Sequence, residues 1–180
     1  MRISGGTLAG RIVRFPPGII RPAMDRMRES VFAVLGDLSG RSFLDLFSGS
    51  GIIALEAASR GASRIEAVES DPLKRKILLE NAALSPVPIR CRFMAVERYL
   101  KRGGDAFDLV FCDPPFPWRY RGELLRALAS SALLAEEALV LVHRPRTETL
   151  DPPAPAMTRR ETRFYGNSAV DFFTAGKFLS

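Results

Sequence analysis

The segment Asp113-Pro114-Pro115-Phe116 combines residue types that can act on an amine attached to an aromatic base. The prolines lack N–H donors and stiffen the backbone, so the Pro114 carbonyl is left as an outward-facing acceptor beside the Asp113 carboxylate. Two neighbouring acceptors suit an NH₂ group, which is a poor nucleophile because its lone pair is delocalised into the ring. Phe116 offers a face for base stacking. We therefore predict that Asp113, Pro114 and Phe116 perform catalysis at an exocyclic amine.

Aromatic and basic side chains alternate directly after this segment, in Trp118-Arg119-Tyr120-Arg121. Such a loop could grip a nucleotide that has been turned out of its stack, because rings stack on bases and arginines pair with phosphates. We predict that Trp118, Arg119 and Arg121 contact the substrate. A proline-rich loop with aromatic anchors is the structural alternative.

A second feature is the stretch Asp45-Leu46-Phe47-Ser48-Gly49-Ser50-Gly51, which joins a predicted strand to a predicted helix. Gly49 and Gly51 allow close backbone approach and leave free N–H groups at the start of a helix. Glu69 follows Gly49 by 20 residues at the end of the next strand, which is the position of a ribose-binding acid in dinucleotide folds. The spacing alone fits several nucleotide cofactors, and it also fits a tight turn without a ligand.

Charge favours one cofactor over the others. A pyrophosphate about 4 Å from Asp45 would be repelled by about 1–4 kcal/mol, whereas S-adenosylmethionine (SAM) carries an ammonium and a sulfonium. Its ribose diol could donate to Glu69. A P-loop is excluded because its motif needs Ser or Thr after Gly-Lys, and the one Gly-Lys pair of the sequence, Gly176-Lys177, is followed by Phe178. We predict SAM as the cofactor, held in part by Asp45, Phe47, Gly49, Gly51 and Glu69.

The elements that position these residues alternate between strand and helix. Apolar runs predict strands at 43–46, 65–68, 89–93, 107–112 and 139–143, and helical patterns fall at 51–60, 72–84, 95–102 and 122–134. Asp71 and Pro72 are typical of a helix start. This order predicts an α/β fold with a parallel sheet that is covered on both faces, and ligands bind at the carboxyl ends of such strands. Two runs at 158–165 and 169–178, joined through Gly166-Asn167, predict an antiparallel edge pair.

The excess positive charge lies mainly near the start of the chain. Of the formal charge of +6, residues 1–41 carry seven arginines against three acids, a net of +4. Arginine suits phosphate, so this favours a nucleic-acid partner, although a solvated face is the alternative. Ile3 with residues 11–15 predicts a small hairpin, and residues 24–35 predict a helix. We divide the chain into a basic extension at 1–40 and a catalytic domain at 41–180.

Other features exclude whole classes of protein. The 180 residues are 47% hydrophobic, which is typical of a folded domain, and no apolar run approaches the roughly 20 residues of a membrane span. The start lacks a signal-peptide pattern, so we expect a cytoplasmic protein. Cys91 and Cys112 lie in apolar runs and are expected to be buried, inert thiols. His143, the one histidine, is expected to be structural and without a partner.

The chain resembles class I SAM-dependent methyltransferases and, more narrowly, the bacterial RsmD family of 16S ribosomal RNA guanine-N2 methyltransferases. The matching segments are Arg2-Ile3-Ser4-Gly5-Gly6 with Gly10-Arg11, Arg21 to Phe32, Phe47-Ser48-Gly49-Ser50-Gly51, and Phe107 to Phe116. The resemblance implies a Rossmann-like, mostly parallel seven-stranded sheet and methyl transfer from SAM to N2 of a guanine in the 16S rRNA of the small ribosomal subunit. We expect a monomer that needs no metal and acts on 16S rRNA, either free or within an assembled or assembling 30S particle. Arg21, Arg26 and Arg28 in the second segment are expected to contact the RNA, although pairs of Arg26 and Arg28 with Asp25 and Glu29 on the helix surface are an equal alternative.

Two positions depart from the family pattern. Ala23 stands where the family usually has Thr, and Met94 stands where it tends to have Asp or Asn facing the adenine of SAM. We expect the backbone of Met94 and Ala95 to hold the adenine instead. Three alternatives stay open: amino methylation of adenine or of another guanine in RNA or DNA, an NAD-linked oxidoreductase, for which no proton donor is found, and a catalytically silent RNA-binding module.

Overall fold

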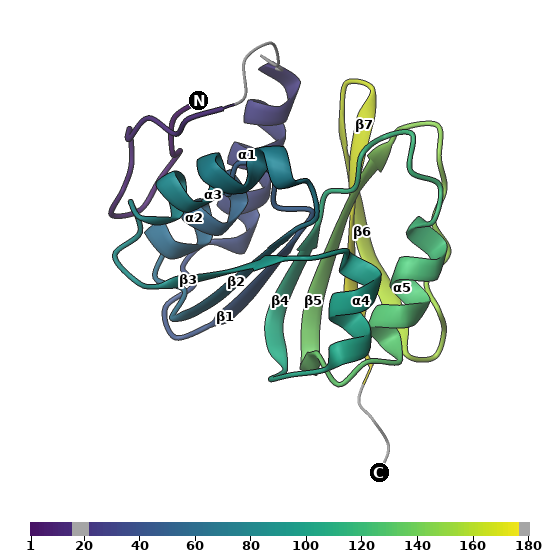
Figure 1. Cartoon of the computed structure of the whole chain (residues 1–180). Coiled ribbons are helices and arrows are strands. Elements are labelled where there is room, and N and C mark those ends of the chain that lie inside the picture. Colours follow the sequence, from purple (N-terminus) through teal and green to yellow (C-terminus); the bar gives the residue numbers. More distant parts are fainter. Residues whose placement is uncertain (16–21, 177–180) are drawn as a thin grey trace.

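A mixed seven-stranded sheet forms the centre of the computed structural model, which describes residues 1–15 and 22–176 (Figure 1). The strand order is β3-β2-β1-β4-β5-β7-β6. Strands β1 to β5 run parallel, whereas β7 is antiparallel to both β5 and β6. The strands are β1 (Ser42–Leu46), β2 (Arg64–Glu69), β3 (Ile89–Phe93), β4 (Phe107–Cys112), β5 (Leu134–Pro145), β6 (Met157–Tyr165) and β7 (Ser168–Ala175). The predicted α/β class, parallel sheet and antiparallel edge pair are confirmed.

Helices cover both faces of this sheet. They are α1 (Pro22–Leu35), α2 (Ile52–Ser59), the 3-10 turn η1 (Pro72–Lys74), α3 (Arg75–Ala82), α4 (Val96–Arg102) and α5 (Arg121–Ala129). Figure 1 shows α1, α2 and α3 on one face and α4 and α5 on the other. The Asp71 side chain accepts from the Leu73 N–H at 2.9 Å, as expected for a cap, although the first turn after it is η1 rather than α-helix.

Two neighbouring boundaries were predicted wrongly. The helix expected at 122–134 ends at Ala129, and β5 begins at Leu134 instead of residue 139. The Ser131 hydroxyl accepts from the Leu133 N–H, and the Leu133 carbonyl accepts from the Phe107 N–H at 2.8 Å. The chain therefore joins the sheet beside the start of β4. This pairing satisfies backbone groups of β4, such as the Phe107 N–H, that would lack a partner if the helix continued to residue 134.

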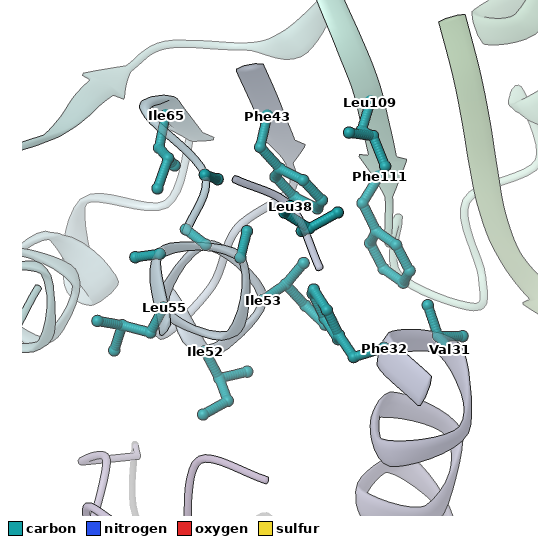
Figure 2. Packing of buried hydrophobic residues seen from close by; sticks show 14 of the residues in the cluster. Val31, Phe32, Leu38, Phe43, Ile52, Ile53, Leu55, Ile65, Leu109 and Phe111 are labelled. Atoms are coloured by element: carbon teal, nitrogen blue, oxygen red, sulfur yellow. The ribbon is translucent and has the colours of Figure 1, made fainter. Parts of the chain in front are cut away.

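Alternation along the buried strands produces two hydrophobic layers. Phe43 belongs to the layer under α1 and α2, while Leu44 and Leu46 belong to the layer under α4 and α5. Figure 2 shows Phe32 and Ile53 packing toward Phe43 in the first layer. Both faces are buried, so the central strands read as continuous apolar runs, which is why the sequence predicted them well.

Residues 1–15 pack onto the same core. They contain an isolated antiparallel bridge between Arg2 and Ile12, so the predicted hairpin is present in a short, irregular form. Ile3 is buried in the layer that also contains α2. Glu56 of α2, fully buried, accepts from the Ser4 N–H at 2.8 Å and from Arg28 Nε at 2.8 Å. The division at residue 40 remains a sequence-based prediction, since both sides of it share one hydrophobic core.

Two further observations bear on the excluded classes. None of the helices formed by residues 1–15 and 22–176 is long and apolar enough to cross a membrane. Cys112 is buried as expected, whereas Cys91 is only partly buried. Burial raises the pKa of both thiols, which agrees with the prediction of unreactive cysteines.

Candidate active site

A cavity of about 790 Å³ opens at the carboxyl ends of β1, β2, β4 and β5. Its walls include residues of the glycine loop, the segment from Glu69 to Asp71, and the segment from Asp113 to Phe116. The two motifs lie nearly 70 residues apart in sequence, and they meet because parallel strands end at the same edge of a sheet. The predicted cofactor loop and catalytic segment thus line one cavity.

The glycine loop is held in an unusual backbone conformation. Phe47, Gly49 and Gly51 have positive φ angles of 63°, 58° and 81°. A side chain at Gly51 would place Cβ 2.7 Å from Leu78 Cδ1, whereas a Cβ at Gly49 would meet no atom closer than 4.0 Å. Gly51 therefore serves the turn into α2, and Gly49 leaves open space beside the backbone for a ligand.

Glu69 closes the loop onto the end of β2. Its Oε2 accepts from the Gly49 N–H and its Oε1 from the Asp71 N–H, both at 2.8 Å. Lys74 Nζ lies 3.5 Å from Oε2 and was not anticipated from the sequence. An ionised carboxylate has about four acceptor sites, so Glu69 can hold the loop and still accept from ribose hydroxyls.

Asp45 is the most deeply buried acid of the cavity, at 1% exposure. Its Oδ2 accepts from Ser48 Oγ at 2.6 Å and from the Ala54 N–H at 3.2 Å, while Oδ1 has no partner among the described residues. Burial, with smaller contributions from Asp113 and Glu69, raises the pKa of Asp45 to about 7. An unpartnered carboxylate oxygen in this wall fits a cationic ligand such as SAM.

Asp113 follows β4 directly and is paired with a residue of the neighbouring strand. Its Oδ1 lies 2.7 Å from Nδ1 of His143 in β5. The ring of Phe116 meets the imidazole edge-on, with centroids 5.2 Å apart. The prediction that His143 has no partner is wrong. The sequence placed both residues at the ends of strands, which is a signal for proximity. It did not give the order of the strands in the sheet, and this order is what brings the two residues together.

Two arginines predicted to contact RNA are buried. Arg28 pairs with Glu56 and with Asp25, and its side chain is 3% exposed. Arg121 donates to the carbonyls of Trp118 and Pro115 and pairs with Glu148 at 2.8 Å. Their N–H groups are directed into the protein, because each guanidinium bonds to protein acceptors on several sides. Both guanidinium groups are therefore engaged inside the protein and are not available to RNA.

The remaining predicted site residues fall into three groups. Arg26 and Arg119 are exposed, and Trp118 packs edge-on against Phe47 with centroids 5.2 Å apart. Met94 and Ala95 follow β3, and the Met94 N–H donates to the Glu69 carbonyl at 3.1 Å, but neither residue is among those that line the cavity. Arg21 lies outside the described residues.

The Pro114 carbonyl, expected as an acceptor for the substrate, has a neighbour inside the protein. Arg121 Nη2 lies 3.5 Å from this oxygen, a long contact compared with its 2.9 Å bond to the Pro115 carbonyl. A carbonyl oxygen has two lone pairs, so the Pro114 oxygen keeps acceptor capacity. Arg121 therefore holds the segment from behind without removing its acceptors.

The chain is similar to known proteins along nearly its whole length. Residues 1–174 match the family described as Conserved hypothetical protein 95. The chain is 35% identical over 160 residues to "Ribosomal RNA small subunit methyltransferase D" of Escherichia coli, which covers 87% of this chain and 80% of that protein. The solved structure of "Putative methyltransferase yhhF from Escherichia coli" superposes with a TM-score of 0.88 at 29% identity and covers 98% of both chains.

A more distant structure shares the fold alone. SMU.776, described as complexed with SAH, has a TM-score of 0.69 at 18% identity and covers 87% of this chain and 50% of that one. The family match, together with the cavity at the carboxyl edge of the sheet, leads to one conclusion. The chain belongs to the Conserved hypothetical protein 95 family, and its sequence is similar to that of ribosomal RNA small subunit methyltransferase D.

Proposed function

We propose that this protein is an enzyme that transfers a methyl group from SAM to the exocyclic N2 amine of a guanine in 16S rRNA of the small ribosomal subunit. The observation that carries the proposal is the shared cavity, in which the glycine loop and Glu69 face the same space as Asp113 and Phe116. The 35% identity to ribosomal RNA small subunit methyltransferase D supports the class of substrate.

The cofactor-binding role is assigned to residues at the ends of β1, β2 and β3. SAM, when bound, supplies a methyl group activated by its sulfonium. Asp45, whose Oδ1 has no partner among the described residues, would balance the positive charge of this ligand, and Glu69 would accept from the ribose hydroxyls while it holds the Gly49 N–H. Phe47 and Gly51 shape the loop. Backbone groups of Met94 and Ala95 would hold the adenine, and because neither residue lines the cavity, the adenine would extend past the cavity wall toward the end of β3.

The catalytic role belongs to Asp113, Pro114 and Phe116. Asp113 and the Pro114 carbonyl accept from the target amine, which turns its lone pair toward the methyl group and away from the ring. Phe116, half-buried in the cavity wall, stacks on the base and excludes water from one side. The main contribution of these residues is the orientation of nucleophile and methyl group for in-line displacement.

The partner is 16S rRNA, either free or within an assembling 30S particle, and the protein acts as a cytoplasmic monomer. The chemistry uses no metal ion, because the methyl group is already activated and the protein needs only to orient and deprotonate an amine. Arg21, Arg26, Trp118 and Arg119 are the proposed RNA contacts. Of these, Arg26 and Arg119 have exposed side chains in the structure.

The decisive experiment supplies labelled SAM with unmodified small-subunit RNA or particles and maps the modified base. We expect label on the N2 amine of a guanine. Asp113→Ala removes the side-chain acceptor, so methyl transfer should fall at least about a hundredfold, the usual scale for a positioned catalytic group. SAM affinity measured by calorimetry should stay nearly constant. Label on adenine would redirect the proposal to another amine, and near-normal transfer by Asp113→Ala would refute the mechanism.

Phe116 provides a separate test of base stacking. Phe116→Ala should lower use of the RNA by about 1–3 kcal/mol per stacked base, whereas Phe116→Tyr should keep much of the activity because the ring face is retained. Melting temperatures of both variants are the control. If Phe116 only anchored the core, its truncation would instead lower stability by about 3–5 kcal/mol, with transfer unchanged at permissive temperature.

A further inference from the structure

The register between β4 and β5 brings His143 next to Asp113. Phe111 pairs with Leu141 and Cys112 with Val142, so the next pair along the two parallel strands is Asp113 with His143. The two side chains meet at 2.7 Å, from His143 Nδ1 to Asp113 Oδ1. An ionised carboxylate can only accept, so Nδ1 carries the hydrogen and donates. The contact fixes one oxygen of Asp113 and leaves Oδ2 for a ligand.

The same imidazole also contacts Phe116. The two rings meet edge to face, with centroids 5.2 Å apart and planes at 61°. The His143 side chain is only 2% exposed, whereas that of Asp113 is 21% exposed. His143 is itself one of the residues that line the cavity, and it touches both of the side chains that are proposed to touch the target base.

The far nitrogen of His143 is less well satisfied. Nε2 is buried and has no hydrogen-bond partner in the described part of the chain. An unpaired buried polar atom destabilises the folded state relative to an apolar group of similar shape. Packing alone would therefore be served better by an aliphatic side chain at this position. The feature that an aliphatic side chain could not supply is the donor to Asp113.

We propose that His143 is a positioning residue: its Nδ1–H orients the Asp113 carboxylate and its ring seats Phe116, so that both meet the target amine in one geometry. This inference rests on the proposed function and deepens it. His143 forms and breaks no covalent bond, and the proton released by the amine goes to the Asp113 side of the pair. A geometry held by packed neighbours is what catalysis by orientation requires.

A spectroscopic test needs neither SAM nor RNA. His143 is the only histidine of the chain, so untagged protein labelled with ¹⁵N-histidine gives one set of imidazole signals. We expect hydrogen on Nδ1 and a marked change of both nitrogen shifts in Asp113→Ala. A hydrogen on Nε2 with Nδ1 bare, or shifts unchanged in Asp113→Ala, would overturn the proposed hydrogen bond.

A kinetic test separates positioning from folding. His143→Leu fills a similar volume without a donor, and we expect kcat to fall at least about tenfold, with SAM Kd within about twofold of wild type and a melting temperature that is unchanged or raised. His143→Asn keeps an N–H near the Nδ1 position and should recover part of kcat. Leu141→Ala, two residues earlier on β5, is the control: it should lower the melting temperature and leave kcat intact at permissive temperature.

The outcomes distinguish this inference from the proposed function. If wild-type protein methylates the RNA but His143→Leu does so at the normal rate, the positioning role is wrong and the proposed function stands. A loss of kcat in His143→Leu that follows its melting temperature and is not recovered in His143→Asn would also refute the role. If wild-type protein transfers no methyl group, the proposed function fails, and the imidazole spectrum still tests the Asp113–His143 contact.

Discussion

Four carboxyl groups of the described residues line the cavity, and three of them, those of Asp45, Glu69 and Asp113, are each held differently. Glu69 accepts backbone N–H groups on both oxygens, and Asp113 has His143 on one oxygen. Asp45 is the most buried and keeps one oxygen without a partner in the described residues. Negative charge is thus concentrated where a cationic cofactor is proposed to bind, and Asp45 is the group whose ionisation should respond to that ligand.

Asp45 predicts a pH dependence of cofactor affinity. Its raised pKa of about 7 means that the free protein holds a proton on this carboxyl at mildly acidic pH, and a cation binds better once that proton has left. Affinity for SAM should therefore rise between about pH 6 and pH 7.5, by roughly five- to tenfold, and level off above the pKa. Calorimetry across this range measures the change.

Asp45→Asn is the matched control for this prediction. The amide has nearly the same shape but cannot ionise, so SAM affinity should be weak and nearly independent of pH over the same range. An unchanged pH dependence in Asp45→Asn would assign the titration to another group of the cavity.

The loop from Asp113 to Tyr120 depends on an element that follows it, the first turn of α5. Arg121, the first residue of that helix, is 1% exposed, donates to the carbonyls of Pro115 and Trp118, and pairs with Glu148 in the segment after β5. One guanidinium thereby ties the catalytic loop to a helix and to a second loop. Its fixed planar fork suits several carbonyls at once, which lysine could not match.

Arg121→Met predicts a combined loss of stability and turnover. The variant keeps the length of the side chain but leaves loop carbonyls and Glu148 without their donor, so unfolding free energy should fall by about 2–3 kcal/mol. Methyl transfer should fall as the loop loses its geometry, while SAM affinity stays near wild type. Arg126→Met, on the exposed face of the same helix, is the control and should change neither quantity appreciably. Equal effects of the two substitutions would contradict the proposed role of Arg121.

At the scale of the whole molecule, positive charge is distributed unevenly along the chain and between surface and interior. The formal charge is +6, and residues 1–41 contribute +4 of it, but part of that charge is internal because Arg28 is paired beneath the surface. Arg26 and Arg119 are exposed, on α1 and on the loop that follows Phe116. These two side chains, rather than the total arginine count, are the described candidates for RNA phosphate contacts.

Neutralising Arg26 and Arg119 together should weaken RNA binding and flatten its dependence on salt. Each lost phosphate contact lowers the log–log slope by roughly one unit, so the double alanine variant should lose about two units. SAM affinity should not change. The matched control is Lys101→Ala with Arg102→Ala, two exposed charges at the end of α4, near the opposite edge of the sheet. A slope that is equal in both double variants would mean that Arg26 and Arg119 form only a solvated surface.

The secondary structure could be predicted closely because its signals are local. Phe107–Cys112 was placed without error, since a strand buried on both faces is a short, continuous apolar run. Where the prediction failed, at residues 130–138, a propensity for helix was overridden by pairing with β4, which depends on residues far away in sequence. The edge pair was predictable because the turn at Gly166-Asn167 carries its own signal.

By itself, the sequence determined the chemistry available at the carboxyl edge of the sheet: a glycine loop with an acid 20 residues later, and an acid followed by two prolines and an aromatic ring. Only the tertiary structure decided which side chains support that chemistry. The placement of β4 beside β5 turned His143 from a lone histidine into the partner of Asp113. Burial turned Arg28 and Arg121 from candidate RNA contacts into internal ties. The physical reason is that residue type and spacing encode local conformation, whereas partners and burial depend on which strands and helices lie next to each other.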